Sequence, residues 1–171
     1  MARMLPFAVR RTLRPSLQVS GRLDVALRRQ WRYIVIHHSA TDEGNEQTFD
    51  RFHKDRGWRG IGYDFVIGNG RGSPDGRIEV TFRWEQQEVG AHAGEREYNE
   101  YGIGICLVGD FDKDEPTPKQ MQALVGLVNR LQESCGIPTR NILMHRQVRP
   151  AGTHCPGKNF PFYDFISQLD H

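Results

Sequence analysis

Hydrophobic residues along most of the chain fall into short runs of strand length. Five such runs are rich in β-branched or aromatic residues, or alternate apolar with polar positions, and we expect each to form a strand: 33–37, 63–67, 77–82, 103–108 and 141–145. Between the second and third runs, the turn-forming residues of 72–76 predict a hairpin with a loop.

Helical periodicity is clearest in the segment that follows Thr117. Thr117 and Gln120 have the spacing of a capping box, and Pro118 suits the first helical position. Apolar residues then recur at helical spacing until Gly136, so one face of this helix should pack on the sheet. Shorter helices are expected at 46–56 and 160–169. Strands interleaved with helices predict an α/β fold, a single domain with a central mixed β-sheet flanked by helices.

Length and composition agree with this fold class. The chain has 171 residues, 37% hydrophobic and 26% charged, which suits one globular domain with a sizeable core. No apolar run approaches the roughly 18 residues that would span a bilayer. We therefore expect neither a disordered chain nor an integral membrane protein, and we expect a monomer.

Positive charge is concentrated at the N-terminus. Residues 1–32 carry eight arginines against one aspartate, so their net charge of +7 exceeds the +2 of the whole chain, and the rest is mildly acidic. We divide the chain into a basic arm, 1–30, and a domain, 31–171. The domain is not expected to bind nucleic acid. The arm is either a solvated extension or a contact for an anionic surface such as lipid headgroups or wall phosphates. It makes a poor signal peptide, because its apolar stretch is short and contains Pro6.

Three residues invite a chemical explanation. Cys155 lies in a turn-rich segment with no periodicity to bury it, whereas His37 and His145 each end an apolar strand. Strand ends that open onto loops are where α/β proteins place their sites, and imidazole with thiolate suits zinc. His38 competes with His37 for the ligand role, because successive strand side chains point to opposite faces. Spacing alone is weak evidence for a zinc site, because histidines at strand ends are common and are often unrelated to one another.

Several separated motifs add to this pattern, and they resemble, in the same order, those of the zinc-dependent N-acetylmuramoyl-L-alanine amidases. That group includes phage lysozyme-like amidases and animal peptidoglycan recognition proteins. The resemblance runs from about Tyr33 to the C-terminus, and its motifs are 35–41, 62–67, 90–94, 103–111, 145–146 and 153–157.

The resemblance implies a set of site residues. The zinc ligands would be His37, His145 and Cys155, and the catalytic pair would be Tyr63 and Thr153. Thr153 can only donate or accept a hydrogen bond, because its hydroxyl does not transfer a proton near neutral pH. On the substrate side, the resemblance implies His38, His92 and Asn99.

The implied reaction is hydrolysis of the amide that joins N-acetylmuramic acid to L-alanine in peptidoglycan or muropeptides. Two other functions remain open at this point. A recognition module would bind peptidoglycan without cleaving it, and such relatives have generally lost the cysteine ligand. A cysteine hydrolase would use Cys155 with His145 and would work without metal, so a chelator distinguishes it.

Overall fold

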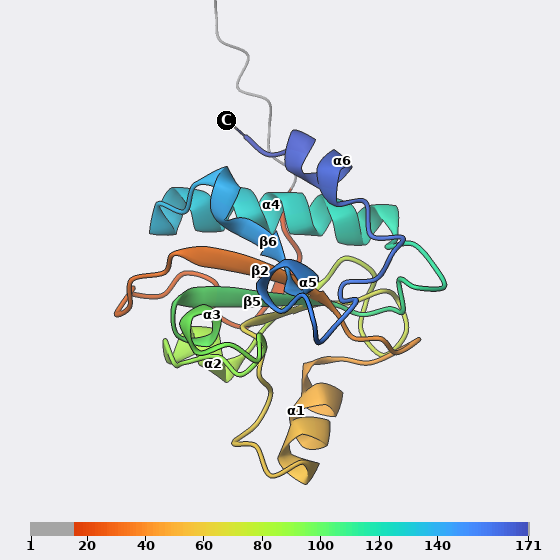
Figure 1. The fold of residues 1–171 in the computed structure, drawn as a ribbon, viewed down its shortest axis with the longest axis horizontal. Coiled ribbons are helices and arrows are strands. Elements are labelled where there is room, and N and C mark those ends of the chain that lie inside the picture. Colours follow the sequence, from red (N-terminus) through yellow and green to blue (C-terminus); the bar gives the residue numbers. More distant parts are fainter. Residues whose placement is uncertain (1–15, 171) are drawn as a thin grey trace, which may run out of the picture.

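A six-stranded mixed sheet forms the middle layer of the molecule (Figure 1), which is a computed structural model that describes residues 16–170. Helices α4 and α6 cover one face of the sheet, and α1 lies on the opposite side. The elements in chain order are β1 (Val19–Ser20), β2 (Tyr33–His38), α1 (Glu46–Asp55), β3 (Phe65–Ile67), β4 (Ile78–Val80), α2 (Phe82–Glu85), α3 (Arg96–Tyr101), β5 (Gly102–Leu107), α4 (Pro118–Cys135), a 3-10 turn (Thr139–Asn141), β6 (Ile142–Met144), α5 (His145–Val148) and α6 (Phe162–Ser167). This confirms the predicted fold class.

The strand order places β2 between two parallel neighbours. The sheet runs β1-β4-β3-β5-β2-β6, and only the β3–β4 pair, which forms the predicted hairpin, is antiparallel. Strands β3, β5, β2 and β6 are therefore parallel, and their carboxyl ends meet at one edge of the sheet. That edge is where the ends of β2 and β6 deliver the predicted histidines.

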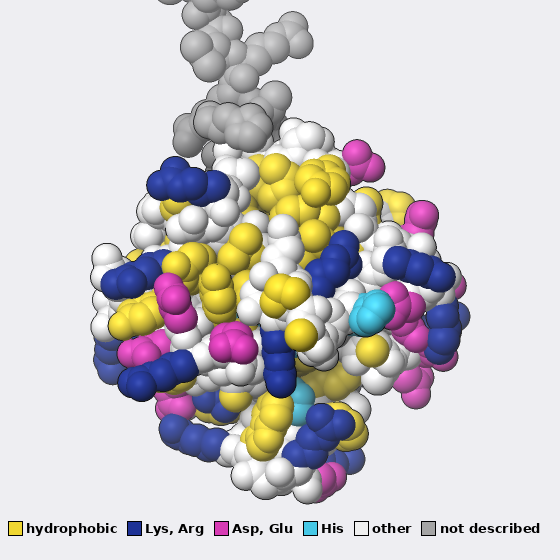
Figure 2. All heavy atoms as spheres, viewed as in Figure 1, with side chains coloured by type: hydrophobic (Ala, Val, Ile, Leu, Met, Phe, Trp, Pro, Cys, Tyr) yellow, Lys and Arg dark blue, Asp and Glu magenta, His cyan; other side chains and the backbone are white. Residues whose placement is uncertain are grey.

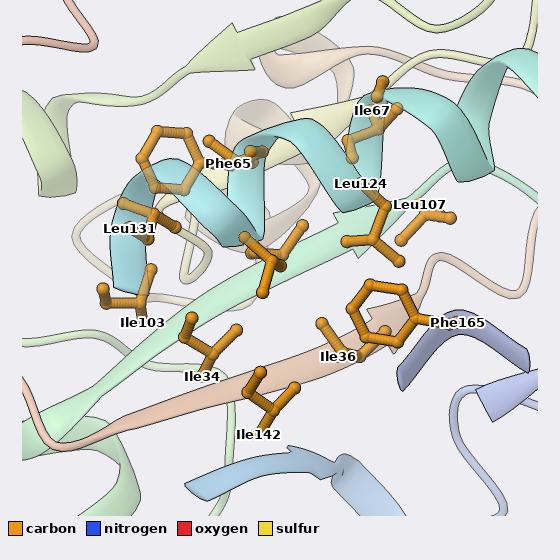
Figure 3. Packing of buried hydrophobic residues seen from close by; sticks show 14 of the residues in the cluster. Ile34, Ile36, Phe65, Ile67, Ile103, Leu107, Leu124, Leu131, Ile142 and Phe165 are labelled. Atoms are coloured by element: carbon orange, nitrogen blue, oxygen red, sulfur yellow. The ribbon is translucent and has the colours of Figure 1, made fainter. Parts of the chain in front are cut away.

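Alternate residues of the strands build the main core against α4 (Figure 3). Ile34 and Ile36 of β2 lie in the same cluster as Leu124 and Leu131 of α4, and all four are almost completely buried. The helix begins as predicted, because Thr117 and Gln120 form the complete capping box, and it ends at Gly136 in the left-handed conformation. The opposite face of β2 carries Val35 and His37, which leaves that face for the site.

Part of the predicted arm belongs to the domain. Residues 16–30 are described; β1 pairs with β4, and the Leu23 carbonyl accepts a hydrogen bond from the Trp84 indole at 2.8 Å. Leu23 also packs against the main core. Backbone pairing and tertiary packing therefore hold part of the expected arm against the domain, where sequence periodicity gives no signal. Residues 1–15 of the arm lie outside the described part.

Other predicted boundaries shift by a few residues, each for a local reason. The strand expected at 77–82 ends at Val80, because the Thr81 side chain accepts from the Arg83 N–H and caps α2. The strand expected at 141–145 ends at Met144, and His145 begins α5. The closing helix covers only Phe162–Ser167 of the expected 160–169.

Charged side chains of both signs are interspersed on the face drawn in Figure 2, with hydrophobic side chains between them. One arginine of the predicted arm contacts the domain, because the Arg29 guanidinium donates to the Glu100 carbonyl at 2.6 Å. Just after the arm, the Arg32 guanidinium lies over the Tyr101 ring. Among residues 16–170, no helix combines the length and hydrophobicity that a membrane crossing requires.

Candidate functional site

His37 and His145 come together because β2 and β6 are parallel and in register. Ile36 pairs with Met144, so the residues that follow them lie at the same edge of the sheet: His37 near the end of β2 and His145 at the start of α5. The two imidazole rings lie 4.4 Å apart between centroids. His37 is almost completely buried, whereas His145 at the start of α5 is partly exposed. The cluster therefore opens to the surface on the side of His145.

Cys155 reaches the same point from the loop after α5. Its sulfur lies 3.7 Å from His37 Nδ1 and accepts a hydrogen bond from the His38 backbone N–H at 3.4 Å. The Arg146 N–H donates to the Cys155 carbonyl at 2.8 Å, which ties the loop back to α5. A backbone N–H directed at sulfur favours the thiolate, the form that binds metal.

These three side chains could hold one metal ion. One ligand atom from each of His37, His145 and Cys155 lies within 4.8 Å of the others. Zinc forms bonds of about 2.3 Å to sulfur and about 2.0 Å to nitrogen. At a tetrahedral angle, these bonds would place the sulfur and the nitrogen roughly 3.5 Å apart. The Cys155–His37 separation of 3.7 Å fits that requirement. Two imidazoles and a thiolate are also donors that zinc prefers, and three ligands leave a fourth position open.

Burial sets the protonation of the two histidines. Burial, together with repulsion from His92 and His145, lowers the pKa of His37 well below its usual value, and burial lowers the pKa of His145. Both rings are therefore neutral near pH 7 and have a lone pair to offer. Burial raises the pKa of the Cys155 thiol to about 12, so without a cation this sulfur stays protonated at neutral pH.

Tyr63 packs beside the cluster. Its ring centroid lies 5.2 Å from that of His37, and the Cys106 thiol lies close enough to its hydroxyl to affect its pKa. Cys106 is fully buried and pairs with His37 in the β2–β5 register, so both belong to the site face of the sheet. Burial and the two cysteines, Cys106 and Cys155, raise the pKa of Tyr63 well above its usual value. Its hydroxyl is therefore a donor at neutral pH.

Thr153 stands two residues before Cys155 and is partly exposed. Its hydroxyl oxygen accepts from the Cys155 N–H at 3.0 Å, which leaves the hydroxyl proton free to donate elsewhere. The structure thus brings five of the expected residues into one neighbourhood: Tyr63, His37, His145, Cys155 and Thr153.

The three residues expected on the substrate side have inward-facing contacts instead. The His92 ring is 7% exposed and lies behind His37, with its Nδ1 3.0 Å from His37 Nε2. Asn99 Oδ1 accepts from the backbone N–H groups of His92 and Ala93, both at 2.8 Å. His38 points to the other sheet face, where its Nδ1 accepts from the Phe111 N–H at 3.0 Å. All three side chains thus make hydrogen bonds within the domain, and their role toward substrate stays a prediction.

Sequence inspection missed two contributors. Cys106 lies on the site face of the sheet beside His37, and it contributes to the raised pKa of Tyr63. The Ala93 carbonyl lies 3.1 Å from His145 Nε2, and a carbonyl contact of this kind has no sequence signal of its own. For Cys106, alternation along β5 could have placed it on the face of the sheet opposite Ile103 and Ile105.

A large cavity lies away from these residues. It has a volume of about 1070 Å³ and lies between α4 and the N-terminal segment, with Leu17, Leu23, Met121 and Val125 among its lining residues. Because it contains neither the histidines nor Cys155, its size does not make it the reaction site.

Comparison with known proteins agrees with this geometry. The family model described as N-acetylmuramoyl-L-alanine amidase matches residues 27–158. An endolysin of Klebsiella phage KP32 is 36% identical over 139 residues, which cover 75% of this chain and 82% of the endolysin.

Two solved structures show the same fold. N-acetylmuramoyl-L-alanine amidase LysC from Clostridium intestinale URNW superposes with a TM-score of 0.74 at 30% identity, covering 91% of this chain and 99% of that one. Peptidoglycan recognition protein-LE, in complex with tracheal cytotoxin, a monomeric diaminopimelic acid-type peptidoglycan, gives a TM-score of 0.66 at 29% identity, covering 85% and 84%. Since the family model spans most of the chain, this protein belongs to the N-acetylmuramoyl-L-alanine amidase family.

Proposed function

We propose that this chain hydrolyses the amide bond between N-acetylmuramic acid and L-alanine in peptidoglycan or muropeptides, with zinc held by His37, His145 and Cys155. The observation that carries the proposal is the convergence of these three side chains at one edge of the sheet, in a chain of the amidase family. Tyr63 packs directly against that cluster.

Zinc bound there would act as a Lewis acid that polarises the amide carbonyl and lowers the pKa of water. The chain itself supplies hydrogen-bond donors around the reacting carbon. Tyr63 keeps its proton at neutral pH, so in this proposal it donates to the oxygen that becomes negative and does not act as a base. Thr153 offers a second donor, because its oxygen is already held by the Cys155 N–H.

The proton balance of the reaction is simple. Water adds to the carbonyl carbon, the carbon–nitrogen bond breaks, and the amine of L-alanine takes up the proton that the water loses. The products are the lactyl carboxylate on the sugar and a free stem peptide.

Peptidoglycan fragments as substrate are supported by a relative. Recognition protein-LE has been solved with a monomeric peptidoglycan, and this chain shares its fold at 29% identity. That likeness also favours a second candidate, a module that binds peptidoglycan without cleaving it. The complete set of His37, His145 and Cys155 favours the enzyme, because binding alone does not require three converging metal ligands.

A cysteine hydrolase fits the site poorly. A nucleophilic cysteine needs a lowered pKa and access to substrate. Cys155 is 8% exposed, and burial raises its pKa to about 12, which is the opposite of activation.

Product analysis tests the proposal. A muropeptide with an intact lactyl–L-alanine bond is incubated with the purified protein, and the products are identified by mass spectrometry. We expect a free stem peptide with an N-terminal L-alanine, and loss of this product when a chelator removes the metal. Binding of the muropeptide without cleavage would support the recognition module, and cleavage that resists the chelator would support a metal-free hydrolase.

A further inference from the structure

The loop of residues 90–94 lies behind both candidate histidine ligands and contacts each of them. The His92 Nδ1 is 3.0 Å from His37 Nε2, and the Ala93 carbonyl oxygen is 3.1 Å from His145 Nε2. In His37, the contact occupies the ring nitrogen opposite the one that faces the Cys155 sulfur.

The direction of these hydrogen bonds follows from what a carbonyl can do. The His92 Nε2 lies 3.1 Å from the Gly102 carbonyl, and a carbonyl oxygen only accepts, so the proton of the neutral His92 ring is on Nε2. The His92 Nδ1 then carries a lone pair and must accept from His37 Nε2. This leaves the lone pair of His37 on Nδ1, the atom that faces the Cys155 sulfur at 3.7 Å.

The same reasoning applies to His145. Its Nε2 must donate to the Ala93 carbonyl, so its lone pair is on Nδ1. One short loop thus places both histidines in the tautomer whose Nδ1 can bind a cation. A histidine that binds zinc generally donates its other N–H to such a partner, which fixes the ring and raises its basicity.

Hydrogen bonds fix the backbone of this loop, and close packing fixes the His92 ring. Asn99 Oδ1 accepts from two backbone N–H groups of the loop, those of His92 and Ala93. The ring itself lies against Gly90 and Gly104, where an added Cβ would come within 2.7 Å and 2.6 Å of ring carbons. Only glycine at these two positions leaves room for the ring behind His37.

We propose that His92 is a positioning residue, which fixes the tautomer and orientation of His37 by accepting its Nε2–H and so sets the affinity of the site for zinc. The proposal rests on the proposed function for the identity of the metal, but the tautomer it assigns to His37 can be measured without any metal.

The first test uses the metal-free wild-type protein. With histidines labelled with ¹⁵N, NMR spectra should show the proton of His37 on Nε2, the proton of His92 on Nε2, and a coupling across the hydrogen bond between His37 Nε2 and His92 Nδ1. A His37 ring protonated on Nδ1 would overturn the proposal, whether or not the protein is an amidase.

Two matched substitutions give the second test. His92→Leu removes the acceptor at similar volume, whereas His92→Asn keeps an acceptor oxygen near the position of Nδ1. Both variants lose the hydrogen bond from His92 Nε2 to the Gly102 carbonyl. The difference in zinc affinity between them therefore measures the effect of the hydrogen bond to His37. The zinc dissociation constant is measured by competition with a chromogenic chelator, after melting curves show which variants fold.

We expect His92→Leu to bind zinc about 10- to 100-fold more weakly and to show a mixture of His37 tautomers, while His92→Asn stays closer to the wild type on both counts. Gly104→Ala, which displaces the ring without removing a polar group, should also weaken zinc binding. Wild-type zinc affinity in His92→Leu, or equal losses in the Leu and Asn variants, would overturn the proposal. If wild-type protein binds no zinc at all, the proposed function fails, and the NMR result still decides the role of His92.

Discussion

Replacing Asp64 with asparagine should stabilise the protein at alkaline pH and have little effect at acid pH. Asp64 is fully buried just before β3; its Oδ2 accepts from the Gly104 N–H at 2.8 Å, and its Oδ1 has no hydrogen-bond partner among the described residues. Burial raises its pKa to about 7, against lowering contributions from the Gly104 N–H and two arginines. An ionised carboxylate in this place is costly, and the amide of asparagine avoids that cost.

The sign and size follow from proton linkage. Between the ordinary pKa of 3.8 and about 7, the folded state keeps a proton that the unfolded state has lost, so stability falls as the pH rises. At about 1.4 kcal/mol per pH unit, the two units from pH 5 to pH 7 amount to about 3 kcal/mol, and the loss is complete by pH 8. Other groups also titrate in this range, but their contributions cancel when wild type and Asp64→Asn are compared at each pH.

Urea unfolding at pH 5 and pH 8, at a fixed zinc concentration, measures this difference. We expect the free energy of unfolding of Asp64→Asn relative to wild type to rise by about 3 kcal/mol between the two pH values. Asp55→Asn, at the exposed last residue of α1, is the surface control. An equal difference between Asp64→Asn and wild type at both pH values would refute the reasoning, because it would mean that Asp64 is already ionised in the folded protein at pH 5.

Three further predictions concern the site and the N-terminus. Tyr63→Phe should keep its zinc, measured by elemental analysis, while turnover falls by on the order of a hundredfold through loss of one donor; unchanged turnover would place its role elsewhere. Cys155→Ser should lose zinc and hydrolysis together, because a serine hydroxyl stays protonated and binds zinc poorly. Cys155→Asp should retain measurable zinc-dependent hydrolysis, because a carboxylate can bind zinc. An Asp variant that holds its full zinc content but is inactive would argue against the ligand set. A chain that starts at residue 31 should melt at a lower temperature than one that starts at residue 16, because it lacks β1 and the Leu23 contact with Trp84; equal melting temperatures would show that this packing adds no stability.

Sequence reasoning worked where the cause of a structure is local. The capping box at Thr117 and Gln120 predicted where α4 begins, and strand ends followed by His37 and His145 predicted two site positions that the fold brings together. The motif resemblance supplied Tyr63 and Thr153, which lie near them.

Sequence patterns gave no signal where the cause is tertiary. Nothing local in His92 or Asn99 distinguishes a side chain that faces substrate from one that supports a ligand from behind, because the difference depends on how the loop packs under β2 and β5. Residues 16–30 likewise have no periodicity, and β1 forms only because β4 offers it a partner.

Zinc titration of activity tests the central claim most directly. Metal-free protein receives increasing zinc, and release of stem peptide from a muropeptide is followed at each addition. We predict that activity rises from background, stops rising at one equivalent of zinc in the wild type, and stays at background in Cys155→Ser. Full activity before any zinc is added, or a titration that is the same in Cys155→Ser, would contradict a zinc amidase site built from His37, His145 and Cys155.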